Sequence, residues 1–118
     1  MSLSDFQAFQ HLADAKWTDL PGFPGIQMIE LADNFDEAAK TGRRTRLVRF
    51  LPGAKSEKPL IHSYWEEAYL IEGEMLYEGA PVLNGPAYRC RPPGTSHGPY
   101  SSPRGCMLLE SHYFAPSP

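Results

Sequence analysis

Cysteine, long apolar runs and surplus positive charge are all scarce in this sequence of 118 residues. Its two cysteines, Cys90 and Cys106, form no Cys-x-x-Cys pair, and we expect both to be packed as small apolar residues rather than joined in a disulfide. No apolar stretch approaches the ~20 residues of a membrane span, and the first residues carry no basic export signal, so we expect a cytoplasmic protein without a membrane partner. Eleven Lys and Arg against fourteen Asp and Glu give a net charge of −3, which excludes a broad cationic surface for nucleic acid.

Glycine and proline, by contrast, are frequent, at 10 and 12 residues, and they interrupt the sequence at short intervals. This spacing favours short strands over long helices and predicts about eight strands of an all-β sandwich or barrel. The clearest strands are expected at residues 26–31, 45–51, 87–91 and 106–114. A hairpin is expected with arms at residues 68–71 and 74–77, with Gly73 as its turn.

The N-terminal residues are expected to stand outside the barrel. Residues 5–13 carry Phe6, Phe9 and Leu12 at helical spacing, which predicts a short amphipathic helix, with an extended segment as the alternative. The length of the chain fits one domain, over residues 1–118. A domain of this size buries enough surface to fold without a disulfide or structural metal, so any metal that it binds is expected to serve its function.

Histidine is the residue that points to a site. His62 is followed at the fourth position by Glu66, and on an extended chain positions four apart face the same side, so the two side chains can converge. His97 follows a tight turn, Pro92-Pro93-Gly94-Thr95-Ser96, that delivers its imidazole at the start of the next strand. Two imidazoles and a carboxylate make a three-point metal site with open coordination positions.

These residues carry a resemblance to the cupin superfamily. Pro92, Gly94 and His97 resemble the second cupin motif. Glu66 and Gly73, which are separated by six residues, resemble the latter half of the first cupin motif. The segment around His97 is similar to the zinc-binding cupin domain of bacterial anti-sigma factors, and the likeness extends over residues 17–114, leaving 1–16 as an N-terminal extension. The resemblance implies a bacterial protein, a double-stranded β-helix or jelly-roll barrel of two antiparallel sheets, and a homodimer.

The resemblance also implies a divalent metal ion, which could be Fe, Zn, Mn or Ni, held by His62, Glu66 and His97. The first motif lacks one of its usual histidines. One alignment makes His62 the second histidine and puts Leu60 in the place of the first. The other makes His62 the first histidine and Tyr64 the second. In both alignments Tyr64 and Glu67 are reserve ligands.

Two further residues are candidates for a supporting role. His112 shares its strand face with Leu108 and Glu110, so it could line the cavity, either as an additional ligand or as a group that supports the ligands. Arg46 lies in a basic run that usually faces solvent, but it shares parity with Val48 and could point inward toward an anionic ligand.

The fold alone leaves two classes of function open. The first is a metal-dependent enzyme of the oxygenase type, acting on a small organic acid or a diketone-like compound. The second is a non-catalytic zinc-binding or small-ligand sensing module. One carboxylate against a divalent cation leaves positive charge in the site, so the ligand is expected to be anionic.

Overall fold

The computed structural model describes residues 8–56, 60–77 and 79–114, and within them it contains eleven strands and one short 3₁₀ helix. The helix, η2, covers Leu12–Asp14. The strands are β1 (Thr18–Asp19), β2 (Ile26–Asp33), β3 (Arg43–Phe50), β4 (Ala54–Ser56), β5 (Leu60–Ile61), β6 (Trp65–Tyr77), β7 (Leu83–Asn84), β8 (Ala87–Arg91), β9 (Ser96–His97), β10 (Tyr100–Ser102) and β11 (Cys106–Tyr113).

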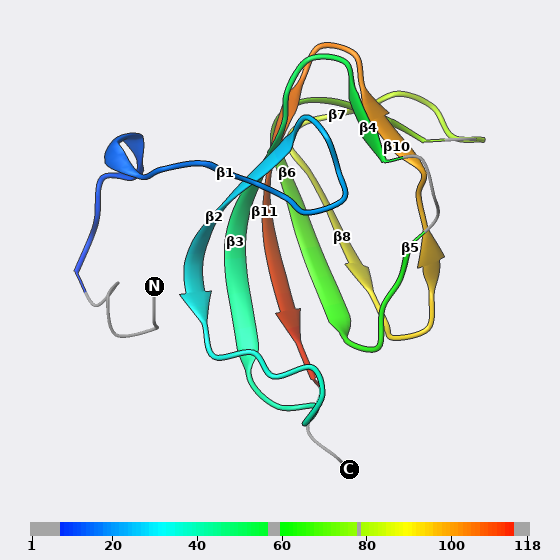
Figure 1. Cartoon of the computed structure of the whole chain (residues 1–118). Coiled ribbons are helices and arrows are strands. Elements are labelled where there is room, and N and C mark those ends of the chain that lie inside the picture. Colours follow the sequence, from blue (N-terminus) through cyan, green and yellow to red (C-terminus); the bar gives the residue numbers. More distant parts are fainter. Residues whose placement is uncertain (1–7, 57–59, 78, 115–118) are drawn as a thin grey trace.

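Nine of these strands form one antiparallel sheet in the order β1-β2-β3-β11-β6-β10-β4, and β7 and β8 also pair with β6. The sheet curls from β2 through β3, β11 and β6 to β8, and the separate β5–β9 pair lies beyond β8 (Figure 1). This arrangement confirms the prediction of an all-β, barrel-like fold. The two sheets are unequal, since the second contains only β5 and β9.

The hydrophobic core follows from alternation along the long strands. Val48 and Phe50 of β3 face inward, and Leu108 of β11 lies opposite both Val48 and Leu70 of β6. Burial of these side chains is the main force that closes the barrel. The core consists of Ile26, Val48, Phe50, Ala54, Ala68, Leu70, Met75, Tyr100, Cys106 and Leu108.

The predicted hairpin at Gly73 is wrong, because β6 runs through this residue without turning back. Leu108 of β11 pairs with Leu70, whereas Met107 pairs with Glu72, so one extra residue of β6 forms a bulge. Gly73 follows that bulge with φ of 89°, and a Cβ here would lie 2.3 Å from the Gly105 carbonyl oxygen. A bulge and a turn both select glycine for its positive φ, which is why the pattern was ambiguous.

The N-terminal helix is shorter than the predicted amphipathic one. Among the described residues from 8 onward, only Leu12–Asp14 is helical, and Phe9 is fully exposed. Residues 5–7 lie outside the described residues. Cys106 is buried as expected, but Cys90 is exposed because it faces outward from β8.

Candidate functional site

Polar side chains occupy the inner face of three adjacent strands beyond the apolar core. His112 of β11 lies opposite Arg44 of β3 and Glu66 of β6, and Glu110 lies opposite Arg46. These positions continue the inward face that carries Leu108, because residues two apart on a strand point the same way. The same face therefore changes from apolar to charged within four residues of β11.

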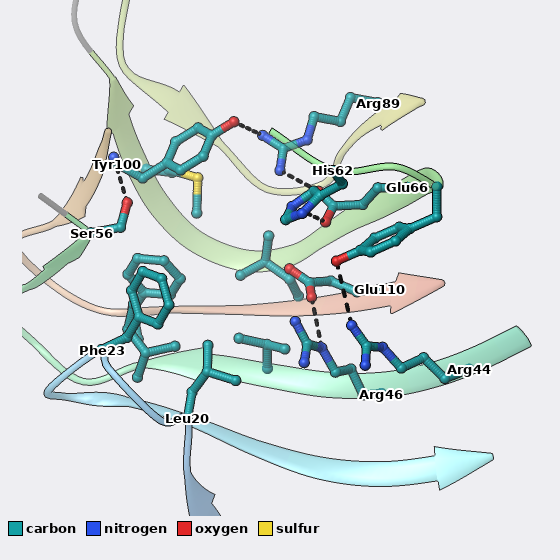
Figure 2. Close-up of a pocket in the computed structure, with 16 residues that line it drawn as sticks. Leu20, Phe23, Arg44, Arg46, Ser56, His62, Glu66, Arg89, Tyr100 and Glu110 are labelled. Atoms are coloured by element: carbon teal, nitrogen blue, oxygen red, sulfur yellow. Dashed lines mark hydrogen bonds and ion pairs between the residues drawn. The ribbon is translucent and has the colours of Figure 1, made fainter. Parts of the chain in front are cut away.

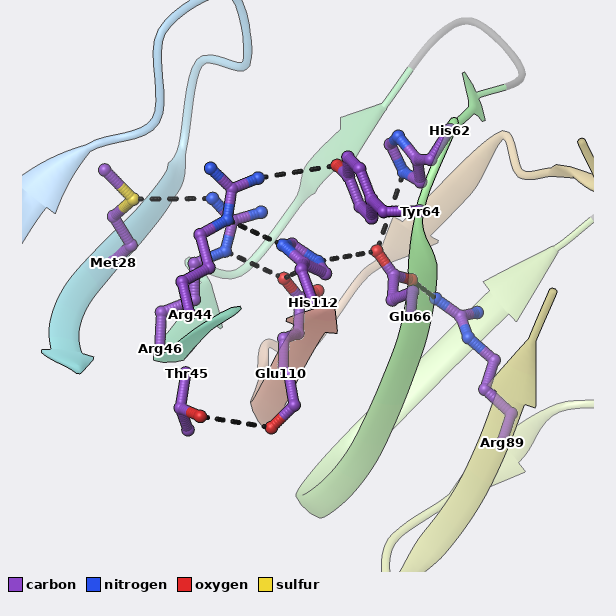
Figure 3. Close-up of polar contacts among 11 residues, drawn as sticks. Met28, Arg44, Thr45, Arg46, His62, Tyr64, Glu66, Arg89, Glu110 and His112 are labelled. Atoms are coloured by element: carbon purple, nitrogen blue, oxygen red, sulfur yellow. Dashed lines mark hydrogen bonds and ion pairs between the residues drawn. The ribbon is translucent and has the colours of Figure 1, made fainter. Parts of the chain in front are cut away.

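His112 is completely buried and is held by hydrogen bonds at both ring nitrogens (Figure 3). Arg44 Nε donates to Nδ1 at 2.7 Å, and Nε2 lies 2.9 Å from Glu66 Oε2. An arginine can only donate, so Nδ1 must accept, and the proton of the neutral ring must sit on Nε2. His112 therefore donates from Nε2 to the carboxylate of Glu66.

Glu66 is the most connected residue of the site, although it is only 3% exposed. Besides His112, Arg89 Nη2 of β8 lies 3.0 Å from Oε1, and His62 Nε2 lies 3.5 Å from Oε2. A buried carboxylate is costly unless it is paired with a cation and hydrogen-bonded. Arg89 and His112 meet both requirements.

A second ion pair joins Arg46 and Glu110, with Nε and Oε1 3.0 Å apart. Burial lowers the pKa of Arg46, but the adjacent Glu110 carboxylate, with smaller contributions from Tyr64 and Glu30, more than offsets this and leaves the pKa above its ordinary value. Arg46 Nη1 also lies 3.7 Å from Met28 Sδ. Arg46 thus points inward, as the parity of β3 indicated, but its charge is already matched by Glu110.

His62 lies just before β6, with its ring stacked on Tyr64 at 4.6 Å between centroids. Burial lowers the pKa of His62, although Glu66 acts in the opposite direction. The neutral imidazole that results is the form that binds metals. Burial raises the pKa of Tyr64 to about 12, and its hydroxyl accepts a hydrogen bond of 3.4 Å from Arg44 Nη2.

These groups line one part of a cavity of about 240 Å³ inside the barrel (Figure 2). His112 is not among the lining residues and lies behind Glu66 and Arg44. The cavity is lined by Leu20, Phe23, Ile26, Arg44, Arg46, Val48, Phe50, Ser56, His62, Tyr64, Glu66, Met75, Arg89, Tyr100, Leu108 and Glu110.

A comparison with protein families decides the identity of the fold. The family model described as the ChrR cupin-like domain matches residues 6–114, nearly the whole chain. The chain belongs to this cupin family. The resemblance that the motifs around His97 and Glu66 indicated is therefore confirmed.

Solved structures show the same cupin fold. An RmlC-like cupin from Shewanella frigidimarina is 23% identical, with a TM-score of 0.69 over 91% of this chain and 90% of the other. An acetylacetone dioxygenase from Acinetobacter johnsonii is 19% identical, with a TM-score of 0.70 over 91% and 74%. The complex of Rhodobacter sphaeroides SigE with the anti-sigma ChrR is 17% identical, with a TM-score of 0.64 over 86% and 50%. At these identities the likeness shows the fold alone.

A search of the curated proteins finds no match. Within the residues that the structure describes, no helix is long and apolar enough to cross a membrane.

The cupin fold brings His62 and Glu66 together, as reported above, and it brings the backbone of His97 to the same region. The turn before β9 contacts His62, because Gly94 N donates to the His62 carbonyl oxygen at 2.9 Å. In the β5–β9 pair, His97 lies opposite Leu60. The side chains of both residues lie outside the described part of the structure.

Glu67, the reserve ligand next to Glu66, lies on the other face of β6. There its carboxylate accepts a hydrogen bond from the Tyr88 hydroxyl of β8. Neighbouring residues on a strand point to opposite faces, so Glu67 cannot reach the cavity while Glu66 lies in it.

Three residues of the site had no part in the expected ligand or supporting set: Arg44, Arg89 and Glu110. The parity of β3 could have placed Arg44 inside with Arg46, and that of β11 could have placed Glu110 with His112. Nothing in the segment Tyr88-Arg89-Cys90-Arg91 shows which arginine meets Glu66, because that depends on strand pairing. Glu66 pairs across the sheet with Arg91, yet the guanidinium that reaches it belongs to Arg89.

The donor atoms fit a metal at one of two places. Glu66, Glu110 and His112 place potential ligand atoms within 4.8 Å of one another, but Nε2 of His112 carries a proton and Glu110 is paired with Arg46. His62 Nε2 and Glu66 Oε2 are 3.5 Å apart and both face the cavity. Two donors that bind one ion at about 2.1 Å lie roughly 3.0 to 3.5 Å apart, so this pair fits a shared metal.

Proposed function

We propose that this cupin is a metal-dependent enzyme of the oxygenase type that acts on a small organic acid or a diketone-like compound. The observation that carries the proposal is the pair formed by His62 and Glu66, whose donor atoms lie 3.5 Å apart on the wall of an internal cavity. Such a pair holds an ion where a small molecule can reach it. The residues proposed to hold the metal are His62, Glu66 and His97.

The remaining polar residues prepare this site. His112 donates to Glu66 Oε2 and Arg89 pairs with Oε1, so the carboxylate is fixed in orientation before any ion binds. Tyr64 stacks on His62 and limits the rotation of its ring. The ion, when bound, would supply Lewis-acid polarisation of substrate oxygens and, as iron, redox chemistry with O₂.

An anionic substrate is supported by the charges of the cavity wall. Arg44, Arg46 and Arg89 face it together with two carboxylates, Glu66 and Glu110, which leaves one positive charge in excess. A divalent ion would add two more. Charge in a cavity of low dielectric is costly unless it is compensated, so an acid or enolate is favoured over a neutral compound.

Metal titration tests the site. Zinc titrated into metal-free wild-type protein should bind at one equivalent, and His62→Ala or His97→Ala should weaken that binding at least tenfold, because each removes one of three ligands. His11→Ala is the matched control, since His11 is exposed and distant in sequence from the site. Full zinc affinity in both site variants would refute the assignment.

Oxygen consumption tests the reaction. Protein loaded with iron under anaerobic conditions should take up O₂ when small acids and diketones are added, and Glu66→Gln should abolish the uptake. If no compound causes O₂ uptake and the protein binds one equivalent of zinc tightly, the proposal of an enzyme is contradicted.

That result would support a zinc-binding or sensing module, which the family match favours. One structure with this fold is ChrR, an anti-sigma factor bound to SigE, and this chain spans about half of that chain's length. The two functions differ in turnover rather than in the residues that hold the metal.

The homodimer is also part of the proposal. Leu109, Tyr69 and Tyr88 lie in one row across β11, β6 and β8, and each is more than a third exposed on the outer face. An apolar row of this kind is suited to contact with a second copy. Sedimentation equilibrium should give twice the monomer mass, and Tyr69→Lys should reduce it to the monomer value.

A further inference from the structure

The cavity has two chemically different ends (Figure 2). At one end the strands present Val48 and Leu108 with Ile26, all of them core residues. Two to four residues further along the same strands they present Arg44, Arg46 and Glu110, which begin the charged end. A ligand that spans the cavity therefore meets hydrocarbon at one end and ionised groups at the other.

A loop closes the apolar end. In the segment from Leu20 to Ile26, Leu20 N donates to Ile26 O at 2.9 Å, Phe23 N to Leu20 O at 3.1 Å, and Ile26 N to Phe23 O at 3.1 Å. These bonds turn Leu20 and Phe23 toward the cavity, where both are partly buried against the core. Figure 2 shows the two side chains on the opposite side of the cavity from Arg44 and Glu66. The loop thus adds apolar surface at the end of the cavity where Figure 2 also shows Ser56 and Tyr100, two polar residues without a formal charge.

The size of the cavity limits what can lie across it. Its volume of about 240 Å³ is many times the roughly 10 to 15 Å³ of accessible space that one buried water molecule needs. A small molecule of about eight to ten non-hydrogen atoms can be accommodated in such a space. A carboxylate uses three of these atoms, and the others form a short chain or a small ring.

We propose that the cavity selects small monocarboxylic acids with an apolar tail, with the carboxylate at the end formed by His62 and Arg44 and the tail against Leu20 and Phe23. This inference rests on the proposed function and narrows its substrate class. It excludes highly polar acids of the same length, because a second charged group would lie against Phe23 and Leu20 without a partner.

A series of matched ligands tests the proposal by calorimetric titration of zinc-loaded wild-type protein. Acetate, butanoate and hexanoate should bind with affinity rising about fourfold for each added methylene, since each buries hydrocarbon at the closed end. Hexanamide, which keeps the tail and loses the charge, should bind at least tenfold more weakly than hexanoate. Adipate, with a second carboxylate at the end of the same chain, should also bind at least tenfold more weakly.

Substitutions in the loop at residues 20–26 test where the apolar tail of the bound acid lies. Phe23→Ala and Leu20→Ala should each reduce the affinity for hexanoate about tenfold and leave the affinity for acetate unchanged, because acetate does not reach them. Val82→Ala is the matched control, since Val82 is an exposed aliphatic residue outside the cavity wall. Two loop variants are used so that one misfolded protein does not decide the result.

Equal affinity for acetate and hexanoate would overturn the inference, as would adipate binding as tightly as hexanoate. The same titrations in metal-free protein separate it from the proposed function. If the protein binds zinc but its affinity for carboxylates does not rise with chain length, the inference is wrong and the proposed function stands. If the protein binds no metal but its affinity for carboxylates rises with chain length, the proposed function is wrong and the binding of the tail at the apolar end is still supported.

Discussion

Arg44 decides which nitrogen of His112 carries the proton, and that choice sets the partner of Glu66. Because Arg44 Nε donates to Nδ1, the Nε2 proton is directed at the carboxylate. The Arg44 guanidinium also packs over the Phe35 ring, 4.7 Å from its centroid, and contacts the Tyr64 hydroxyl. These contacts hold the arginine in place, so it acts as a positioning residue for the whole cluster.

The tautomer can be measured directly. In ¹⁵N spectra of metal-free protein, His112 should show a protonated Nε2 and an unprotonated Nδ1. Arg44→Met should remove this preference and give a mixed or reversed tautomer, because nothing then donates to Nδ1. Arg43→Met is the control, since Arg43 is the exposed neighbour. An unchanged His112 signal in Arg44→Met would show that the arginine does not select the tautomer.

The two cysteines differ in reactivity for a reason visible at the same scale. Burial raises the pKa of the Cys106 thiol, whereas Cys90 is exposed. A disulfide reagent added to native protein at neutral pH should modify one thiol per chain rapidly, since the thiolate is the reactive form. Cys90→Ser should abolish that reaction and Cys106→Ser should leave it intact. Rapid modification of the Cys90→Ser protein would contradict the burial of Cys106.

Among the elements, β6 has the central position. It pairs with β11 and β8 along its first half and with β7 and β10 along its second, and the bulge before Gly73 separates the two halves. Glu66 lies on the first half and Met75, a core residue, on the second. The bulge therefore lets one strand serve both the polar end and the apolar end of the barrel.

Gly73→Ala should destabilise the fold by more than about 2 kcal/mol, because strain at positive φ adds to a clash of the new Cβ with the Gly105 carbonyl. Gly79→Ala is the matched control. Its φ is also positive, at 79°, but no atom lies within 4 Å of the added Cβ, so only the conformational strain remains. Urea denaturation of the two variants gives the difference. Equal losses would show that the close approach at Gly73 costs nothing.

The β5–β9 pair tests which alignment of the first motif applies. If Leu60 occupies the place of the missing histidine, Leu60→His should tighten zinc binding about tenfold or more and make it more dependent on pH, because another imidazole must lose its proton. Ile61→His, one position along the same strand and therefore on its other face, is the control. Unchanged affinity in Leu60→His would favour the alignment that replaces the histidine by Tyr64.

How far the sequence predicts this structure depends on the kind of information required. Strands at residues 26–31 and 87–91 follow from local composition and turn residues, and β2 and β8 contain them. Local patterns also indicate that His62 and Glu66 share a side. They do not specify which strands are neighbours, so the contact of Arg89 with Glu66 could not be foreseen. The prediction at Gly73 was wrong because a positive φ occurs both in a hairpin turn and next to a β-bulge.

For the molecule as a whole, the core and the candidate metal site are separate. The ten core residues include none of the proposed ligands, so folding should not depend on the ion. Removal of metal with a chelator should leave the far-ultraviolet circular dichroism spectrum unchanged. Adding zinc at 100 times its Kd should raise the free energy of unfolding by about 2.7 kcal/mol. Unfolding of the protein by the chelator would show that the metal is structural.

The central position of β11 has a consequence for biosynthesis. Residues 106–113 lie between β3 and β6 in the sheet, and their paired residues on these strands are more than 55 and more than 30 positions away in the sequence. Contacts this distant in sequence form late and slow folding. While residues 106–113 are still inside the ribosome, β3 and β6 each expose an unpaired edge, and neither Glu110 nor His112 has reached Arg46 and Glu66. We therefore expect the nascent chain to be most prone to association with other chains at this stage, and the pairs that Glu110 and His112 form with Arg46 and Glu66 to be among the last contacts made.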